Sequence, residues 1–205
     1  MPNFHQIISD LPLWKHKLII KPLQGGMTNI NFLVEEDQQK YVARFALVSN
    51  TLLGLDRKRE LYNTKIAAGE NIGPKVIAFY PHHNLLILEY IPGTIATPLS
   101  VKKPGNILLL AKILQQLHSG KKFQGELNLF DSIRSYLAEV RKRRSWIPAD
   151  LSILLAHLKR IEQQLQFKTN IPCHLDLMVE NIVFHKKEVR LIDWEYSANS
   201  DLRFD

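Results

Sequence analysis

The sequence predicts an α+β fold in two lobes, because strand-like segments fill its first half and helix-like segments most of its second. Between residues 17 and 89 the chain has short runs of β-branched and aromatic residues, separated by polar or glycine turns. From residue 107 onward, apolar residues recur every three or four positions over longer stretches. Strands followed by helices favour an α+β arrangement over a doubly wound sheet. We expect an N-terminal lobe over residues 1–90 and a C-terminal lobe over residues 91–205.

The N-terminal lobe is predicted to be an antiparallel sheet with one helix. Three strands form the first meander, over residues 18–20, 30–34 and 41–45. The pair Gly25-Gly26 separates the first two strands, and a polar turn over residues 35–39 separates the second two. Residues 51–68 are charged and predict a helix that ends at Gly69. Two further strands are expected over residues 75–79 and 85–89.

The segment from Glu89 to Gly93 interrupts regular structure and is expected to be a hinge between the lobes. After it, apolar stripes predict helices around residues 107–117, 133–140 and 151–165. Near the end, residues 182–184 and 189–192 resemble two short strands joined by a polar turn. Such a hairpin would place Asn181 at its entry and Asp193 at its exit, on the same side.

Composition is ordinary for a soluble globular protein, with 45% hydrophobic and 23% charged residues in 205. No apolar run is long enough for a membrane helix, and the first residues lack the pattern of a signal peptide. The single cysteine, Cys173, cannot form an internal disulfide, so a cytoplasmic location is expected. The net charge of +7 and the run Arg141–Arg144 raise the possibility of a polyanionic partner. A solvated helix end explains that run equally well, and without a nucleic-acid-reading motif we expect no nucleic-acid partner.

The polar residues at the end of the chain indicate phosphoryl transfer. Asn181 follows Asp176 by five residues, and Asp193 follows the predicted hairpin. In transfer from Mg-ATP, an aspartate accepts or orients the proton of the attacking hydroxyl, while an asparagine and a second aspartate hold magnesium. Amide and carboxylate oxygens suit this hard ion. Taken singly, each residue is more typical of a turn or a helix cap.

Two features of the N-terminal lobe are compatible with this chemistry. Arg44 lies in an otherwise apolar strand, and Glu60 lies on the helix that follows. A strand cation that contacts phosphates, held by a helix carboxylate, is required in active kinases. An exposed arginine and one more surface charge would explain the same residues. The glycine pair and its neighbours Thr28 and Asn29 could approach phosphates, although most such pairs are simply tight turns.

Several motifs in order along the chain resemble the choline/ethanolamine kinase family, within the aminoglycoside phosphotransferase and protein-kinase-like group. The resemblance extends from residue 23 to residue 205. The matching segments are Gly25–Asn29, Tyr41–Arg44, Gly73–Val76, Leu88–Gly93, His174–Asp176 with Asn181, and Leu191–Tyr196. The last of these is also similar to the thiamine kinase branch.

The resemblance implies a two-lobed protein-kinase-like fold that uses ATP and Mg²⁺. It implies that Asp176 is the catalytic base, that Asn181 and Asp193 are the magnesium ligands, and that Arg44 contacts phosphate with Glu60 as its partner. The residues implied in nucleotide binding are Gly25, Gly26, Thr28, Asn29, Arg44, Glu89, Tyr90 and Ile91. Glu195 and Tyr196 would border the pocket of the acceptor substrate.

The acceptor is expected to be a small-molecule alcohol, with choline or ethanolamine first. Aromatic faces and carboxylates hold quaternary ammonium groups, and Trp194, Glu195 and Tyr196 could begin such a cage, although Trp194 could equally be core packing. Thiamine and aminoglycosides are alternative acceptors, the latter disfavoured by the positive net charge. Family members continue past the segment that ends at Asp205, so the C-terminal lobe is expected to be incomplete. A non-catalytic nucleotide-binding protein is therefore a further alternative, and the oligomeric state is left open.

Overall fold

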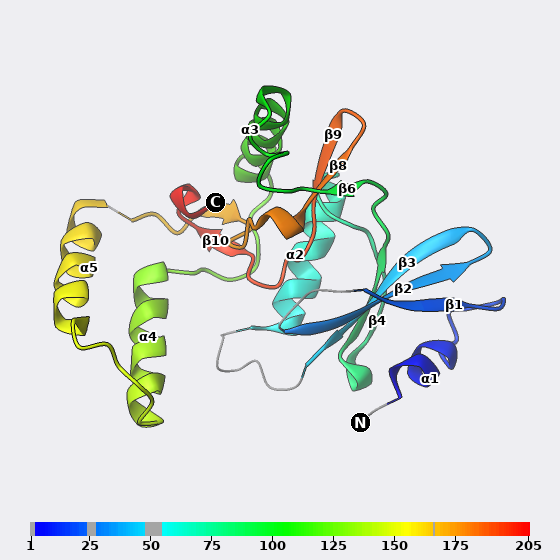
Figure 1. Ribbon diagram of the computed structural model, residues 1–205, viewed down its shortest axis with the longest axis horizontal. Helices are drawn as coiled ribbons and strands as arrows, with labels where there is room; N and C mark the ends of the chain where they lie inside the picture. The colour runs from blue at the N-terminus through cyan, green and yellow to red at the C-terminus, as the bar shows by residue number, and fades with distance from the viewer. Residues whose placement is uncertain (1–2, 24–27, 48–54, 166) are drawn as a thin grey trace.

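The computed structural model describes residues 3–23, 28–47, 55–165 and 167–205 (Figure 1). Its elements confirm the predicted α+β class, with a five-stranded antiparallel sheet followed by a region of helices and short strands. The pair Gly25-Gly26, expected to contact phosphates, and the first residues of the helix predicted from residue 51 lie outside the described residues. Among the residues described, no helix is long and apolar enough to cross a membrane.

The N-terminal sheet contains all five strands that the sequence predicts in this region. They are β1 (Ile19–Leu23), β2 (Asn29–Glu36), β3 (Gln39–Ala46), β4 (Val76–Tyr80) and β5 (Leu85–Glu89), in the order β1-β2-β3-β5-β4. The turn between β2 and β3 is only two residues long, because Asp37 and Gln38 both adopt positive φ, as tight hairpin turns require. One face of the sheet packs on the short helix α1 (Phe4–Ser9), whose Ile8 is fully buried.

The helix α2 (Arg57–Gly69) begins later than the sequence predicts. Asp56 caps it, since the Asp56 carboxylate accepts hydrogen bonds from the backbone nitrogens of Lys58 and Arg59. Residues 55 and 56, which the sequence prediction placed inside the helix, therefore precede it, with Asp56 as the cap. The buried positions of α2 include polar residues, among them Glu60 and Asn63, so an apolar stripe does not mark the buried face.

In the described residues from 90 onward, the chain forms three helices and five short strands. The helices are α3 (Pro104–His118), α4 (Leu129–Lys142) and α5 (Leu151–Leu165). The strands are β6 (Thr94–Ile95), β7 (Ile171–Cys173), β8 (Ile182–His185), β9 (Glu188–Leu191) and β10 (Ala198–Ser200). The predicted hairpin is confirmed as β8 and β9, and β10 pairs with β7. Three-residue 3-10 turns lie at Pro81–His83, Val179–Asn181 and Leu202–Phe204.

The connection between the five-stranded sheet and the three-stranded sheet β6-β8-β9 is short and sterically tight. β5 pairs with β3 and β4, whereas β6 pairs with β8, so the chain changes sheet within residues 90–93. Gly93 has a φ of +153°, and a Cβ there would lie 2.6 Å from the backbone oxygen of Phe184. Only glycine permits this approach.

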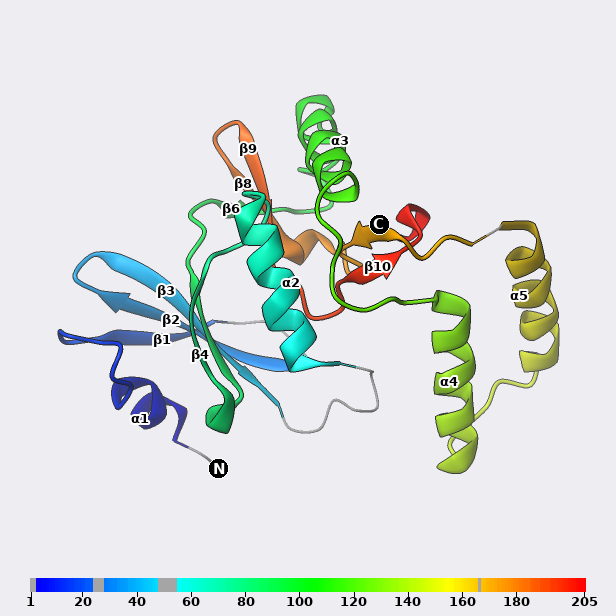
Figure 2. The ribbon, with the colours of Figure 1, turned by 180° about the vertical axis from the view of Figure 1, so that it is seen from behind.

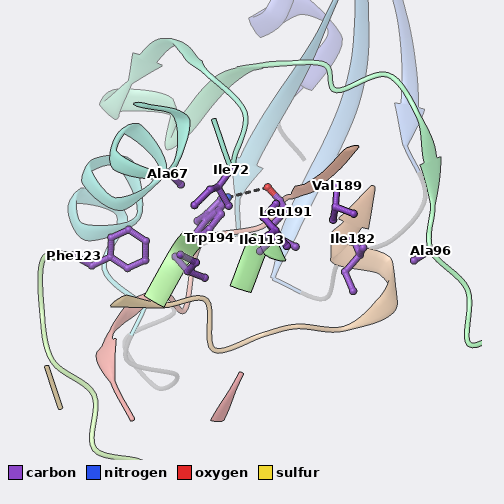
Figure 3. Packing of buried hydrophobic residues seen from close by; sticks show 10 residues of the cluster. Ala67, Ile72, Ala96, Ile113, Phe123, Ile182, Val189, Leu191 and Trp194 are labelled. Carbon is purple, nitrogen blue, oxygen red and sulfur yellow. Dashed lines mark hydrogen bonds between the residues drawn. The ribbon is translucent and has the colours of Figure 1, made fainter. Parts of the chain in front are cut away.

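A second core lies beneath α2 and α3 and contains Trp194, which is 1% exposed (Figure 3). Its indole Nε1 donates to the backbone oxygen of Leu191 at 3.0 Å, and its ring meets Phe123 edge-on. Gly73 adjoins the indole so closely that a Cβ would lie 2.7 Å from Nε1. Burial therefore decides between the two roles considered for Trp194: the core-packing alternative is confirmed, and the aromatic-cage alternative is wrong.

The helices α4 and α5 lie to one side of the remaining structure in both ribbon views (Figures 1 and 2). The apolar stripe predicted for residues 151–165 is present in α5, but none of its described residues is buried. Ile153, Leu154 and Ile161 are each about half exposed, at 60%, 50% and 48%. The apolar pattern therefore predicts the helix correctly, but no described part of the chain buries the apolar face of this helix.

Candidate active site

The loop that follows β7 holds Asp176 and Asn181 against each other. The Asn181 side-chain nitrogen donates to Asp176 Oδ2 at 2.8 Å and to the Asp176 backbone oxygen at 2.9 Å. The 3-10 turn at Val179–Asn181 makes this return possible across five residues. Burial, together with the charges of Asp193 and Glu195, raises the pKa of Asp176. A carboxylate of raised proton affinity beside an open cavity is suited to accept a proton.

Asp205 fixes the beginning of this loop. Its carboxylate accepts hydrogen bonds from the backbone nitrogens of His174 at 2.9 Å and Leu175 at 2.7 Å, and it contacts His118 Nε2 at 3.0 Å. The Asp205 side chain is 0% exposed. Leu175 adopts a φ of +65°, which is uncommon for a non-glycine residue, and the Asp205 hydrogen bond helps to hold that conformation. Sequence reasoning noted this aspartate without giving it a role.

The β8-β9 hairpin returns the chain so that Asp193 lies beside the same loop. The backbone nitrogen of Ile192 donates to the backbone oxygen of Asn181 at 2.9 Å, which ties the exit of the hairpin to its entry. Asp193 has a φ of +69°, a left-handed conformation that aspartate tolerates better than most residues. His174 also contacts the exit of the hairpin, since its Nε2 lies 2.9 Å from the backbone oxygen of Ile192.

Arg44 reaches from β3 to both Glu60 on α2 and Asp193. Its guanidinium lies 3.3 Å from Glu60 Oε1 and is ion-paired with Asp193 Oδ1. Burial alone would lower the pKa of Arg44, but the carboxylates of Asp193, Glu60 and Glu195 more than offset it and raise the pKa. The pairing of Arg44 with Glu60 matches the sequence expectation, and the exposed-arginine alternative is wrong, because Arg44 is buried. The contact with Asp193 was not anticipated.

Glu195 connects the two lobes. Its Oε1 accepts from the Thr28 hydroxyl at 2.6 Å, and its Oε2 accepts from the Asn29 side chain at 3.0 Å and from Arg57 Nη1 at 3.0 Å. Both carboxylate oxygens are therefore engaged by donors from the N-terminal lobe. Sequence reasoning missed Arg57, although its position three residues before Glu60 at the start of a helix was a signal that the two could pair.

A cavity of about 410 Å³ opens in front of these residues. The described residues that line it are Thr28, Leu175, Asp176, Met178, Glu180, Asn181, Asp193, Glu195 and Tyr196. Four of them are carboxylates and none is a lysine or arginine, so the cavity is acidic although the whole chain carries a charge of +7. Net charge is therefore a poor guide to the acceptor, and the argument it gave against polycationic acceptors does not apply at this site.

Tyr196 lies on the wall of this cavity, as expected of a residue that borders an acceptor pocket. Burial and the nearby charge of Glu195 raise the pKa of its phenol, which keeps the hydroxyl protonated. Tyr196 thus adds an aromatic ring and a protonated hydroxyl to the lining of the cavity.

The residues expected near adenine lie where β5 leaves the N-terminal sheet. The Glu89 carboxylate accepts from the backbone nitrogen of Lys75 at 3.0 Å, and the Tyr90 backbone nitrogen donates to the Lys40 oxygen at 3.3 Å. The Lys40 ammonium sits 5.8 Å from the centre of the Tyr90 ring. Neither they nor Ile91 lines the 410 Å³ cavity. The expected adenine segment is therefore not part of the lining of the expected acceptor cavity.

The donor set in the cavity suits a magnesium ion. Asp176, Asn181 and Asp193 all line it, and they offer carboxylate and amide oxygens, which this ion prefers. Asn181 forms its hydrogen bonds to Asp176 through the side-chain nitrogen, so its side-chain oxygen is the atom left to face a cation.

Comparisons with known proteins agree with this architecture. A sequence model of the choline/ethanolamine kinase family matches residues 20–205. Protein LicA of Haemophilus influenzae is 26% identical over 190 residues, covering 88% of this chain and 54% of LicA. Thiamine kinase of Escherichia coli strain K12 is 23% identical over 192 residues, covering 91% of this chain and 64% of the enzyme. The chain thus spans about half to two thirds of the length of these relatives.

Solved structures give the same result. The crystal structure of choline kinase LicA from Streptococcus pneumoniae superposes with a TM-score of 0.78 at 28% identity, covering 97% of this chain and 69% of that one. A LicA structure in complex with AMP superposes at 0.73 with 26% identity, over 97% and 69% of the two chains. With the family model matching nearly its whole length, the chain belongs to the choline/ethanolamine kinase family.

Proposed function

We propose that this protein is an ATP- and Mg²⁺-dependent phosphotransferase that moves the γ-phosphate to the hydroxyl of a small metabolite, choline or ethanolamine first. The observation that carries the proposal is the convergence of Asp176, Asn181 and Asp193 on one cavity. Family membership and the AMP complex of a LicA structure support the use of a nucleotide.

In this proposal Asp176 orients the acceptor hydroxyl and accepts its proton. Its contact with Asn181 fixes the direction of the carboxylate, and its raised pKa favours proton uptake. Asn181 and Asp193 would hold magnesium, which when bound offsets negative charge on the transferring phosphoryl group. Arg44 would contact the phosphates, with Glu60 holding its guanidinium. Catalysis then comes mainly from positioning and charge stabilisation.

The acidic cavity favours a cationic acceptor. Asp176, Glu180, Asp193 and Glu195 contribute negative charge, and Tyr196 contributes an aromatic face. Carboxylates and aromatic rings together hold quaternary ammonium groups. Glu195 already accepts three hydrogen bonds from the protein, and one of them comes from the Arg57 guanidinium, which partly offsets its charge. It would therefore attract such a cation less than Asp176 and Glu180 do.

Two other functions are supported by specific observations. Thiamine is also a cation with a primary hydroxyl, and a thiamine kinase is among the relatives. A non-catalytic nucleotide-binding role is supported by the likeness to a LicA structure in complex with AMP, because binding a nucleotide does not require phosphate transfer. Under that alternative Mg-ATP would raise the melting temperature, since any ligand of the folded state does so, but no acceptor would be phosphorylated.

The test is a panel of acceptors assayed by ADP release, with choline, ethanolamine, thiamine and an aminoglycoside in parallel. We expect choline or ethanolamine to give the highest kcat/KM. Asp176→Ala should lower kcat at least a thousandfold while Mg-ADP still binds, since catalytic-base loss costs roughly 10²–10⁴ and positioning is also lost. The exposed Asp131→Ala is the matched control. Full turnover in Asp176→Ala would refute the assignment, and Mg-ATP binding with no acceptor turnover would favour the non-catalytic role.

A further inference from the structure

Arg57 occupies the junction between the first turn of α2 and the segment that follows β9. One nitrogen, Nη1, lies 2.6 Å from Glu60 Oε2 and 3.0 Å from Glu195 Oε2. The side chains of Glu60 and Glu195 are only 2% and 4% exposed, and that of Arg57 is 18% exposed. A single guanidinium nitrogen therefore bridges a carboxylate of the N-terminal lobe and a carboxylate of the C-terminal lobe.

This bridge differs from an ordinary pair on a helix surface. A pair three residues apart on an exposed helix contributes a few tenths of a kcal/mol. Glu195, however, is 138 residues from Arg57 in sequence and is buried. Two buried carboxylates brought together repel unless a cation lies between them. Arg57 is the cation that contacts both, so its loss would leave this repulsion uncompensated at their junction.

Each of the two carboxylates also holds another part of the site. Glu60 is the partner of Arg44, which in turn reaches Asp193. Glu195 accepts from Thr28 and Asn29, where the described chain resumes after the glycine pair. The position of Arg57 thus affects the phosphate-contacting cation and the end of the glycine segment together.

We propose that Arg57 is a positioning residue that bridges Glu60 and Glu195 and thereby holds Arg44 and the Thr28-Asn29 segment against the C-terminal lobe. Its effect on catalysis rests on the proposed phosphotransferase function, whereas the bridge itself does not. Arg57 is not among the residues that line the 410 Å³ cavity, so it acts through the groups it orients.

The functional test compares Arg57→Gln, Arg57→Lys and the exposed neighbour Lys58→Gln in the full chain. Calorimetry measures Mg-ADP affinity, and steady-state kinetics separates kcat from the KM for ATP. We expect Arg57→Gln to weaken Mg-ADP binding about tenfold or more, as loss of one partner from a buried charge pair does. Arg57→Lys should restore most of the affinity, because one nitrogen makes both contacts. Lys58→Gln should stay within about twofold.

A second test is independent of activity. A double-mutant cycle combines Arg57→Gln with Glu195→Gln and measures urea unfolding, with Lys58→Gln and Glu195→Gln as the control cycle. We expect the combined effect on the unfolding equilibrium constant to differ from the product of the single effects by about tenfold, while the control cycle is multiplicative. If Arg57→Gln does not fold, Arg57→Met and Arg57→Lys take its place in the cycle.

The two tests separate the two proposals. Wild-type-like Mg-ADP binding and kinetics in Arg57→Gln, together with a multiplicative cycle, would overturn the bridge. A coupled cycle in a protein that binds no Mg-ADP would support the bridge and overturn the proposed function. Lower stability with unchanged affinity and kinetics would overturn the positioning role.

Discussion

Replacing Asp205 should destabilise the fold far more than replacing a surface aspartate. In Asp205→Ala the backbone nitrogens of His174 and Leu175 and the ring of His118 lose a shared acceptor whose side chain is 0% exposed. Each hydrogen bond to a charged group contributes about 1.5–3 kcal/mol. Losing the hydrogen bonds of two backbone donors lowers the free energy of unfolding by roughly 3–6 kcal/mol. Because water can partly reach the backbone nitrogen of Leu175 and replace its acceptor, we expect a loss of about 3–5 kcal/mol.

Urea unfolding followed by circular dichroism measures this loss. The control is Asp131→Ala, since Asp131 is 68% exposed and pairs with the exposed Arg134, a contact that contributes about 1 kcal/mol or less. Asp205→Asn retains one acceptor oxygen and should fall between the two. A loss for Asp205→Ala no larger than that of Asp131→Ala would refute the conclusion that this carboxylate holds the loop.

Two further predictions concern buried titratable groups. Burial lowers the pKa of His174 below its ordinary value of 6.5, so the folded state binds fewer protons than the unfolded state just below that pH. The contribution of His174 to the free energy of unfolding should be fully present above pH 6.5 and fall as the pH drops below it. Melting temperatures measured against pH should fall less steeply for His174→Gln than for the wild type, whereas the exposed His82→Gln should keep the wild-type dependence. Burial and the charge of Asp205 raise the pKa of the Cys173 thiol to about 12. At pH 8 a disulfide reagent should therefore not react with Cys173 in the folded protein, but should react with it fully in the protein unfolded by guanidinium. If the folded protein reacted at the rate of a free thiol, the conclusion that Cys173 is buried would be wrong.

Much of the N-terminal sheet follows from local pattern. β5 runs from Leu85 to Glu89 as predicted, because an unbroken apolar run between turn residues leaves little choice. The polar turn before β3 and the end of α2 at Gly69 also followed from local pattern, although α2 begins later than predicted. The short strands β7 and β10 were not, since three residues carry no periodicity and β7 contains Pro172. Pairing with each other defines both strands.

The candidate site divides in a similar way. Asp176, Asn181 and Asp193 were found because their spacing reflects local loop and hairpin geometry. Asp205 was not given a role, because the backbone donors that it accepts from lie about 30 residues away. The spacing of Arg57 and Glu60 was a local signal, but the contact of Arg57 with Glu195, 138 residues away, is encoded by no local pattern. Trp194 shows the opposite problem, since its neighbours in sequence suggest a pocket residue while the Gly73 approach encloses it in the core.

The ion pair between Arg44 and Asp193 has a consequence for how ligands would associate. A divalent cation alone, approaching Asp193, competes with a guanidinium already paired to it, so its binding is weakened by that competition. A polyphosphate gives Arg44 another anionic partner and relieves the competition. Under the proposed function, binding linkage would then make cation and nucleotide mutually reinforcing, each raising the affinity of the other by the same factor. The protein would thus select the metal-nucleotide complex over either component.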